Sequence, residues 1–144
     1  MTPEQTRSAK EIGPILLIDD EPYIIRALSF LLTREGYTVM IADNGDDGLE
    51  RIREFHPPLV FLDIMMPRMN GYEVCKQIRR DPSLADTYVI MLSAKGQRDD
   101  REGGLLSGAD EYVTKPFSPR EIAQKVHALM AQRAAAGHST TGGT

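Results

Sequence analysis

The chain has 144 residues, enough for one domain with its own core but too few for two full domains. Hydrophobic residues make up 41% and charged residues 26%, a balance that argues against intrinsic disorder. The net charge of -4 excludes a strongly cationic nucleic-acid surface over the whole domain, the single cysteine excludes an intramolecular disulfide, and the apolar runs are too short to cross a membrane.

Five short runs of β-forming residues predict five strands. They are Ile15–Asp19, Tyr37–Ala42, Leu59–Asp63, Tyr88–Leu92 and Glu111–Thr114. Most of these runs are continuously apolar rather than alternating, which is typical of strands covered on both faces, as in a parallel sheet.

Helical patterns fill the intervals between the strands, with proline at first positions and Asn or Ser as caps. The predicted helices run from Glu21 to Arg34, from Asn44 to the residue before Pro57, from Asn70 to Asp81, from Arg98 to Ser107 and from Ser118 to Met130. Gly103 and Gly104 weaken the fourth of these helices, since each glycine costs about 1 kcal/mol relative to alanine in a helix interior.

The alternation of strand and helix predicts a (βα)5 fold with right-handed crossovers and a parallel sheet. Five strands are too few for an eight-stranded barrel, so an α/β doubly wound open sheet remains. In such a sheet ligands bind at the carboxyl ends of the strands.

Polar side chains gather at those strand ends. Asp19 and Asp20 close the first strand, Asp63 closes the third, and Ser93 and Lys115 follow the fourth and fifth. Each one alone could be a helix cap, a turn residue or a solvated charge, but four strand ends of this kind argue against coincidence. Carboxylates crowded into one pocket repel each other, and an all-oxygen set of this kind suits Mg²⁺.

The sequence resembles the receiver domains of two-component response regulators, the CheY-like superfamily, over about residues 14–132. The motifs that carry the resemblance are Leu17–Glu21, Leu62–Gly71, Leu92–Ala94, Gly108–Asp110 and Thr114–Phe117. The resemblance implies a flavodoxin-like sheet with strand order 2-1-3-4-5. Outside the receiver domain, residues 1–13 are expected to form a flexible N-terminal segment and residues 133–144 a flexible C-terminal tail or the start of a linker.

The resemblance also implies a role for the acidic residues. Asp63 would be the phosphoacceptor, taking a phosphoryl group from a histidine to form an acyl phosphate. Asp19, Asp20 and Asp63 would coordinate Mg²⁺, together with the backbone carbonyl of Met65. Because the Met65 side chain offers no polar group to orient an attacking water, we expect slow self-hydrolysis of the phosphorylated form.

Further residues would complete the site and its switch. Lys115 would neutralise charge on the phosphoryl oxygens, and Ser93 would donate its hydroxyl to one of them. The bond between Lys115 and Pro116 would be cis. Tyr112 would be the aromatic residue that turns inward on activation, with an ordinary core or edge tyrosine as the alternative. The output would be a repacked face of the fourth helix, last strand and last helix.

The expected partners are a histidine kinase or histidine phosphotransfer protein as donor, and a downstream protein target or an output domain outside this chain. A phosphorylation-dependent homodimer is a further expectation, whereas direct nucleic-acid binding and membrane association are not expected. The polar residues 1–14 contain no secretory signal, so the cytoplasm is the expected compartment.

Two other functions fit parts of the same pattern. Aspartate-nucleophile hydrolases usually carry a second acid two residues after the nucleophile, where this chain has Met65, so no turnover of an external substrate is expected. A receiver-like protein-binding module that works without phosphorylation remains the alternative to a phosphorylated switch.

Overall fold

The computed structural model describes residues 12–94 and 108–143. The helix predicted from Arg98 to Ser107, with its two glycines, lies outside the described residues, as do residues 1–11 of the predicted N-terminal segment.

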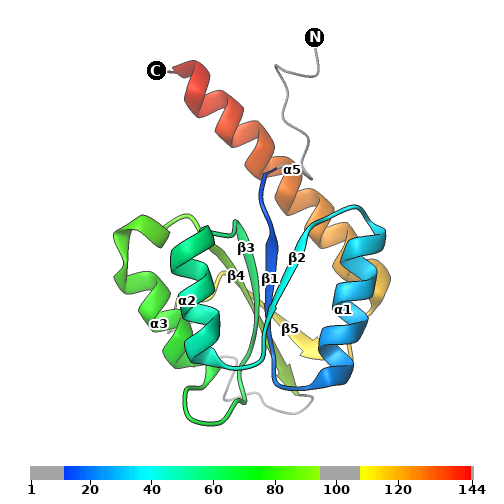
Figure 1. Cartoon of the computed structure of the whole chain (residues 1–144). Helices are drawn as coiled ribbons and strands as arrows, with labels where there is room; N and C mark the ends of the chain where they lie inside the picture. The colour runs from blue at the N-terminus through cyan, green and yellow to red at the C-terminus, as the bar shows by residue number, and fades with distance from the viewer. Residues whose placement is uncertain (1–11, 95–107, 144) are drawn as a thin grey trace.

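Five parallel strands form one sheet in the order β2-β1-β3-β4-β5, which confirms the predicted topology (Figure 1). The strands are β1 (Ile15–Ile18), β2 (Val39–Ala42), β3 (Leu59–Asp63), β4 (Tyr88–Ala94) and β5 (Glu111–Lys115). β1 ends one residue earlier than predicted because Asp19 turns the chain, its side chain accepting a hydrogen bond from the Glu21 N–H at 2.8 Å. β2 begins two residues later because the Tyr37 N–H bonds back to the Leu32 carbonyl.

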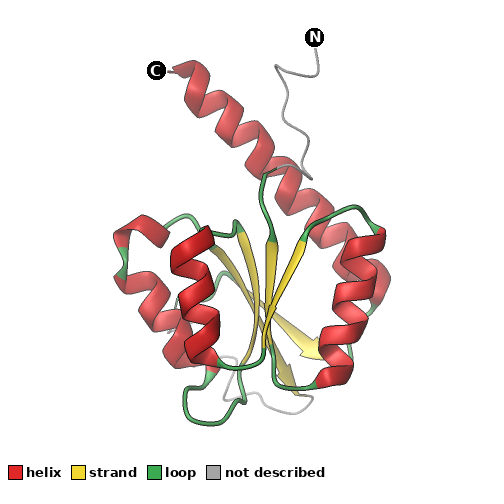
Figure 2. Cartoon of the chain, viewed as in Figure 1, coloured by secondary structure: helices red, strands yellow, loops and turns green. Residues whose placement is uncertain are grey.

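Helices cover both faces of the sheet (Figure 2). They are α1 (Pro22–Arg34), α2 (Gly45–Phe55), α3 (Gly71–Arg80) and α5 (Pro119–Gly143), with a short 3₁₀ turn at Pro82–Leu84. α1 and α5 pack on one face, and α2 and α3 on the other. The predicted caps are present: Asn44 accepts from Asp47 N–H, Asn70 forms a capping box with Glu73, and Ser118 accepts from Glu121 N–H.

The last helix is longer than the sequence predicted. α5 runs without interruption to Gly143, through the residues that were expected to form a tail. The three alanines at positions 134–136 are strong helix formers and extend the helix beyond Met130. The division between a receiver domain ending at residue 132 and a flexible tail stays a prediction.

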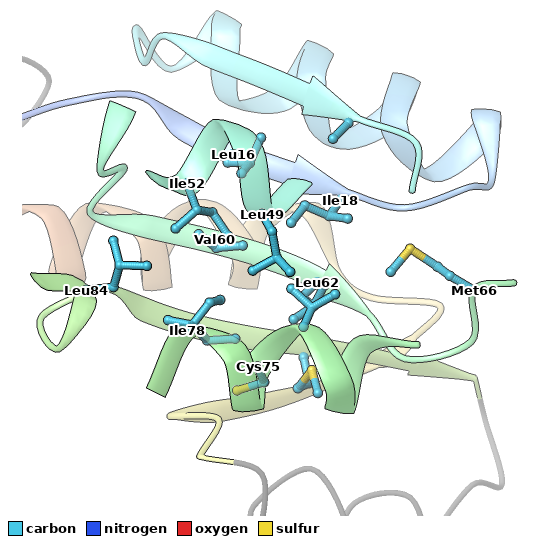
Figure 3. Close-up of a cluster of buried hydrophobic side chains, with 14 of the residues drawn as sticks. Leu16, Ile18, Leu49, Ile52, Val60, Leu62, Met66, Cys75, Ile78 and Leu84 are labelled. Atoms are coloured by element: carbon cyan, nitrogen blue, oxygen red, sulfur yellow. The ribbon is translucent and has the colours of Figure 1, made fainter. Parts of the chain in front are cut away.

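Two apolar clusters lie on opposite faces of the sheet, and alternate strand residues supply them. Leu16, Val60 and Leu62 pack against α2 and α3 (Figure 3), whereas Leu17 and Phe61 pack against α1 and α5. All of these side chains are buried. The continuous apolarity of the strands thus follows from burial on both faces. Within the described part of the chain, no helix is both long and apolar enough to cross a membrane.

Candidate functional site

The register of the sheet places two aspartates side by side. Ile18 pairs with Leu62, so the next residues along the two strands, Asp19 and Asp63, leave the sheet at the same level. Their exposed fractions are 1% and 3%. Asp20 is exposed, yet each of the three carboxylates offers an oxygen that lies within 4.8 Å of the others. The predicted acidic cluster is therefore present.

Lys115 brings a positive charge to this cluster from the end of β5. Its Nζ lies 3.0 Å from Asp19 Oδ2, 3.2 Å from Asp63 Oδ1 and 3.0 Å from Glu21 Oε1. The peptide bond between Lys115 and Pro116 is cis, the conformation that the resemblance implied. Glu21 makes a contact to which the sequence had assigned no role. Its signal in the sequence is its place directly after Asp19 and Asp20, the two acids that follow β1.

The two carboxylate oxygens of Asp19 have different partners. Its Oδ1 accepts the backbone hydrogen bond of Glu21, whereas its buried Oδ2 accepts no well-oriented hydrogen bond within the described residues, although Lys115 Nζ lies nearby. Burying a carboxylate oxygen costs free energy unless a hydrogen bond or a cation compensates it. Burial raises the pKa of Asp19 above its ordinary value, and the hydrogen bond from Glu21 and the contact with Lys115 oppose that rise.

The site carries more negative charge than Lys115 compensates. Burial and the neighbouring charge of Asp19 raise the pKa of Asp63 to about 7, although Lys115 acts in the opposite direction. Burial alone would lower the pKa of Lys115, but its contact with Asp19 and the charges of Asp63 and Asp19 raise that pKa to about 12. Ionising both buried aspartates, Asp19 and Asp63, therefore costs free energy unless another cation is bound.

The donor set fits a hard divalent cation. The carboxylates of Asp19, Asp20 and Asp63 supply only oxygen, the ligand type that Mg²⁺ prefers. The buried Oδ2 of Asp19, which lies 3.0 Å from Lys115 Nζ, offers a further oxygen for such an ion. The residues present thus fit Mg²⁺.

The loop after β3 folds tightly against Asp63. The Gly71 N–H donates to the Ile64 carbonyl at 2.9 Å, and a Cβ at position 71 would lie 2.4 Å from the carbonyl oxygen of Asp63. Only glycine allows this approach of the α3 start to the strand end. Met65 lies in this loop, two residues beyond Asp63, with its side chain 60% exposed. The sequence showed Gly71 as part of a motif but gave no sign of this contact.

Ser93 and Tyr112 lie on the neighbouring strands. Leu92 pairs with Asp63, so Ser93 stands one residue beyond the level of Asp63, and it is buried. Tyr112 pairs with Met91 on β4 and packs, partly buried, against the cluster on the α2 and α3 side. Ser93 therefore lies near the carboxyl end of β4, and Tyr112 lies within β5.

Comparison with known proteins gives the family. The sequence profile of the response regulator receiver domain matches residues 15–127. The chain belongs to the response regulator receiver family. The match extends from the first residue of β1 into α5 and includes all the residues of the acidic cluster and Lys115.

Two curated relatives come from Bacillus subtilis. The receiver domain is 42% identical over 116 residues to the alkaline phosphatase synthesis transcriptional regulatory protein PhoP, covering 81% of this chain and 48% of PhoP. It is 43% identical over 127 residues to the transcriptional regulatory protein ResD, covering 88% of this chain and 50% of ResD. The chain spans about half the length of these relatives.

Solved structures give the same result. The signal receiver domain of a signal transduction histidine kinase from Syntrophus aciditrophicus aligns with a TM-score of 0.77 at 30% identity, covering 83% of this chain and 91% of that chain. The receiver domain of the Francisella response regulator 1452 aligns with a TM-score of 0.75 at 30% identity, covering 84% and 98%.

Proposed function

We propose that this receiver domain is a phosphorylated switch of a two-component or phosphorelay system, with Asp63 as the phosphoacceptor. The observation that carries the proposal is the set of contacts around Asp63, which is buried beside Asp19 and Asp20 and lies 3.2 Å from the Lys115 ammonium. A carboxylate with an ammonium group beside it can act as a nucleophile toward a phosphoryl group, because the ammonium compensates the negative charge of that group.

The transfer step conserves all atoms. An Asp63 carboxylate oxygen attacks the phosphorus of a phosphohistidine, the P–N bond breaks, and its electron pair returns to the imidazole of the donor. The product is an acyl phosphate on Asp63. Lys115 stays beside the reacting carboxylate and offsets negative charge on the phosphoryl oxygens, and the Ser93 hydroxyl donates a hydrogen bond to one of them after transfer.

Asp19, Asp20, Asp63 and the backbone carbonyl of Met65 would hold Mg²⁺. When bound, the ion supplies charge neutralisation to the phosphoryl oxygens and relieves the repulsion among the carboxylates. The clustering of the three carboxylates supports this assignment, because one oxygen of each lies within 4.8 Å of the others.

The remaining parts of the proposal follow from membership of the family. The donor is a histidine kinase or a histidine phosphotransfer protein, and the compartment is the cytoplasm. Ser93 and Tyr112 transmit phosphorylation to the face formed by β5, α5 and the helix expected within residues 98–107. A downstream protein, an output domain or a second phosphorylated copy binds that face. The chain turns over no external substrate.

The decisive experiment measures the intact mass of the protein after incubation with acetyl phosphate and Mg²⁺. We expect one added phosphoryl group, absent with EDTA and absent in Asp63→Asn. Formation of a Mg²⁺–beryllofluoride complex gives a second measurement of an intact site. Failure of both measurements in the folded protein would overturn the proposal and favour a binding module that works without phosphorylation.

A further inference from the structure

Two side chains of α5 reach the edge of the sheet opposite the acidic cluster. They are Lys125 and His127, which flank the buried Val126. In a helix, residues two positions apart point about 200° apart, so these two side chains leave α5 on opposite sides while Val126 enters the core.

His127 binds the turn between α1 and β2 with both ring nitrogens. Its Nδ1 is hydrogen-bonded to the Tyr37 hydroxyl at 2.6 Å, and its Nε2 to Glu35 Oε1 at 2.7 Å. The rings of Tyr37 and His127 also lie with centroids 5.4 Å apart. Tyr37 is buried and cannot move without disturbing the core on this face of the sheet.

Lys125 forms contacts on the opposite flank of α5 from His127. Its ammonium is hydrogen-bonded to Glu111 Oε1, at the first residue of β5. Glu111 also accepts a hydrogen bond at Oε2 from the hydroxyl of Tyr88, the first residue of β4, at 3.2 Å. On each flank of α5 the contacts thus involve one acid and one tyrosine, and both sets lie at the amino-terminal edge of the sheet.

We propose that these six residues form an anchor that fixes the direction in which α5 leaves the domain. The α5 anchor consists of Glu35, Tyr37, Tyr88, Glu111, Lys125 and His127. From Pro119 to His127 the helix runs about 12 Å, and Met130, one turn further on, is still buried in the core on this face. The end of α5 beyond Met130 projects past the sheet (Figure 1).

The partial exposure of the acidic and basic anchor side chains indicates that they orient α5 more than they stabilise the fold. The side chains of the Lys125–Glu111 ion pair and of the His127–Glu35 contact are 27% to 43% exposed, so each pair contributes little to the free energy of unfolding. A contact on one flank would still allow the helix to rock toward the other, whereas contacts on both flanks oppose rocking in either direction. The proposal concerns the unphosphorylated protein and does not depend on chemistry at Asp63.

The test measures the direction of α5 by pulsed electron spin resonance. Spin labels are placed at Glu50→Cys on α2 and Ala135→Cys on α5, both exposed, in a Cys75→Ala background. The variants are His127→Phe, which keeps an aromatic ring, and Lys125→Met, which keeps the aliphatic stem, alone and combined. Gln124→Ala, exposed on the same turn of α5, is the matched control.

We expect a single narrow distance in the parent and in the control. In the double variant we expect the distance to shift or broaden by about 3 Å, which corresponds to a tilt of about 20° over the roughly 8 Å from the buried Met130 to Ala135. Each single variant should give part of that change and alter the Tm by only about 1–3 °C.

Distances in the double variant that match the Gln124→Ala control would overturn the proposal. If the double variant does not fold, the single variants decide by the same criterion, since each removes one flank. A large loss of Tm with unchanged distances in either single variant would show that its contacts stabilise the fold without orienting α5.

Discussion

Lys115 at the end of β5 lies 3.2 Å from Asp63 at the end of β3, although β4 separates these two strands in the sheet. The lysine side chain therefore extends across the carboxyl end of β4, where Ser93 is buried. The same ammonium contacts Asp19, the residue that directly follows β1, so one side chain connects the ends of three strands. Substituting Lys115 or Asp63 should alter the free energy of unfolding in a direction that depends on pH and on Mg²⁺.

Replacing Asp63 should stabilise the metal-free protein. The raised pKa of Asp63 shows that its charged form is unfavourable in the fold, because of burial and the charge of Asp19. We expect Asp63→Asn to increase the free energy of unfolding at about pH 8 by about 1–3 kcal/mol without Mg²⁺. The same variant should lose most of the rise in Tm that Mg²⁺ produces. Urea unfolding with EDTA and with Mg²⁺ measures both; a destabilised apo variant would contradict the prediction.

The pH dependence of stability should follow the same carboxyl group. The pKa of Asp63 is about 7 in the fold and about 4 in an unfolded chain, so the folded state binds the extra proton between these values. Stability contributed by the protonated group is present at about pH 4 and is lost as the pH rises through about 7. The rise in Tm caused by Mg²⁺ should grow over the same range, because the ion binds the ionised carboxylates. Melting curves from about pH 5 to 8.5 measure this, and Asp63→Asn should flatten the slope in EDTA.

Removing the lysine should have the opposite effect to removing the aspartate. Lys115→Met leaves the buried carboxylates of Asp19 and Asp63 without their cation. We expect the free energy of unfolding in EDTA at about pH 8 to fall by about 2–4 kcal/mol, and the increase on adding Mg²⁺ to become larger. Lys76→Met, at an exposed position of α3, is the matched control. An equal loss of stability in both variants would indicate that the contacts of Lys115 contribute nothing.

Gly71 should tolerate no side chain. A Cβ there would lie 2.4 Å from the Asp63 carbonyl oxygen and 2.9 Å from the Ile64 Cα, both backbone atoms. We expect Gly71→Ala to lose about 3 kcal/mol of stability and to weaken Mg²⁺ binding by displacing Asp63. Gly48→Ala is the comparison, since its nearest atom is the flexible end of the Ile18 side chain and alanine favours the helix. Thermal melts that rank Gly48→Ala as the more damaging change would be evidence against a rigid contact at Gly71.

The exposed Met65 should set the lifetime of the phosphorylated form. Its thioether cannot orient a water molecule, so we expect slow loss of the phosphoryl group in the parent protein. A carboxamide at the same position could hold a water molecule near the acyl phosphate, and Met65→Asn should accelerate the loss by at least about tenfold. The isosteric Met65→Leu should decay like the parent. Intact mass recorded over time after removal of acetyl phosphate gives the rates, and rapid decay of the parent would contradict the first expectation.

The acidic site could be predicted from sequence because parallel strands present their carboxyl ends at one edge. Asp19 and Asp63 end apolar runs, and Lys115 follows a short run of β-forming residues, so their convergence needed only the strand order. The contacts of His127 could not be predicted, because Tyr37 lies 90 positions earlier and no local pattern links the two. The length of α5 was underestimated because the glycines and β-branched threonines near its end have low helix propensity.

The alternation of β3 between the two apolar clusters also protects the position of Asp63. Leu59 and Phe61 fill one cluster, and Val60 and Leu62 fill the other. Shifting β3 by a single residue would move each of these side chains from one cluster to the other and turn the Asp63 carboxylate to the opposite face of the sheet. Folding errors that misplace the phosphoacceptor would therefore also misplace four large core side chains. Selection for a well-packed interior and selection for an intact site would then reject the same insertions and deletions.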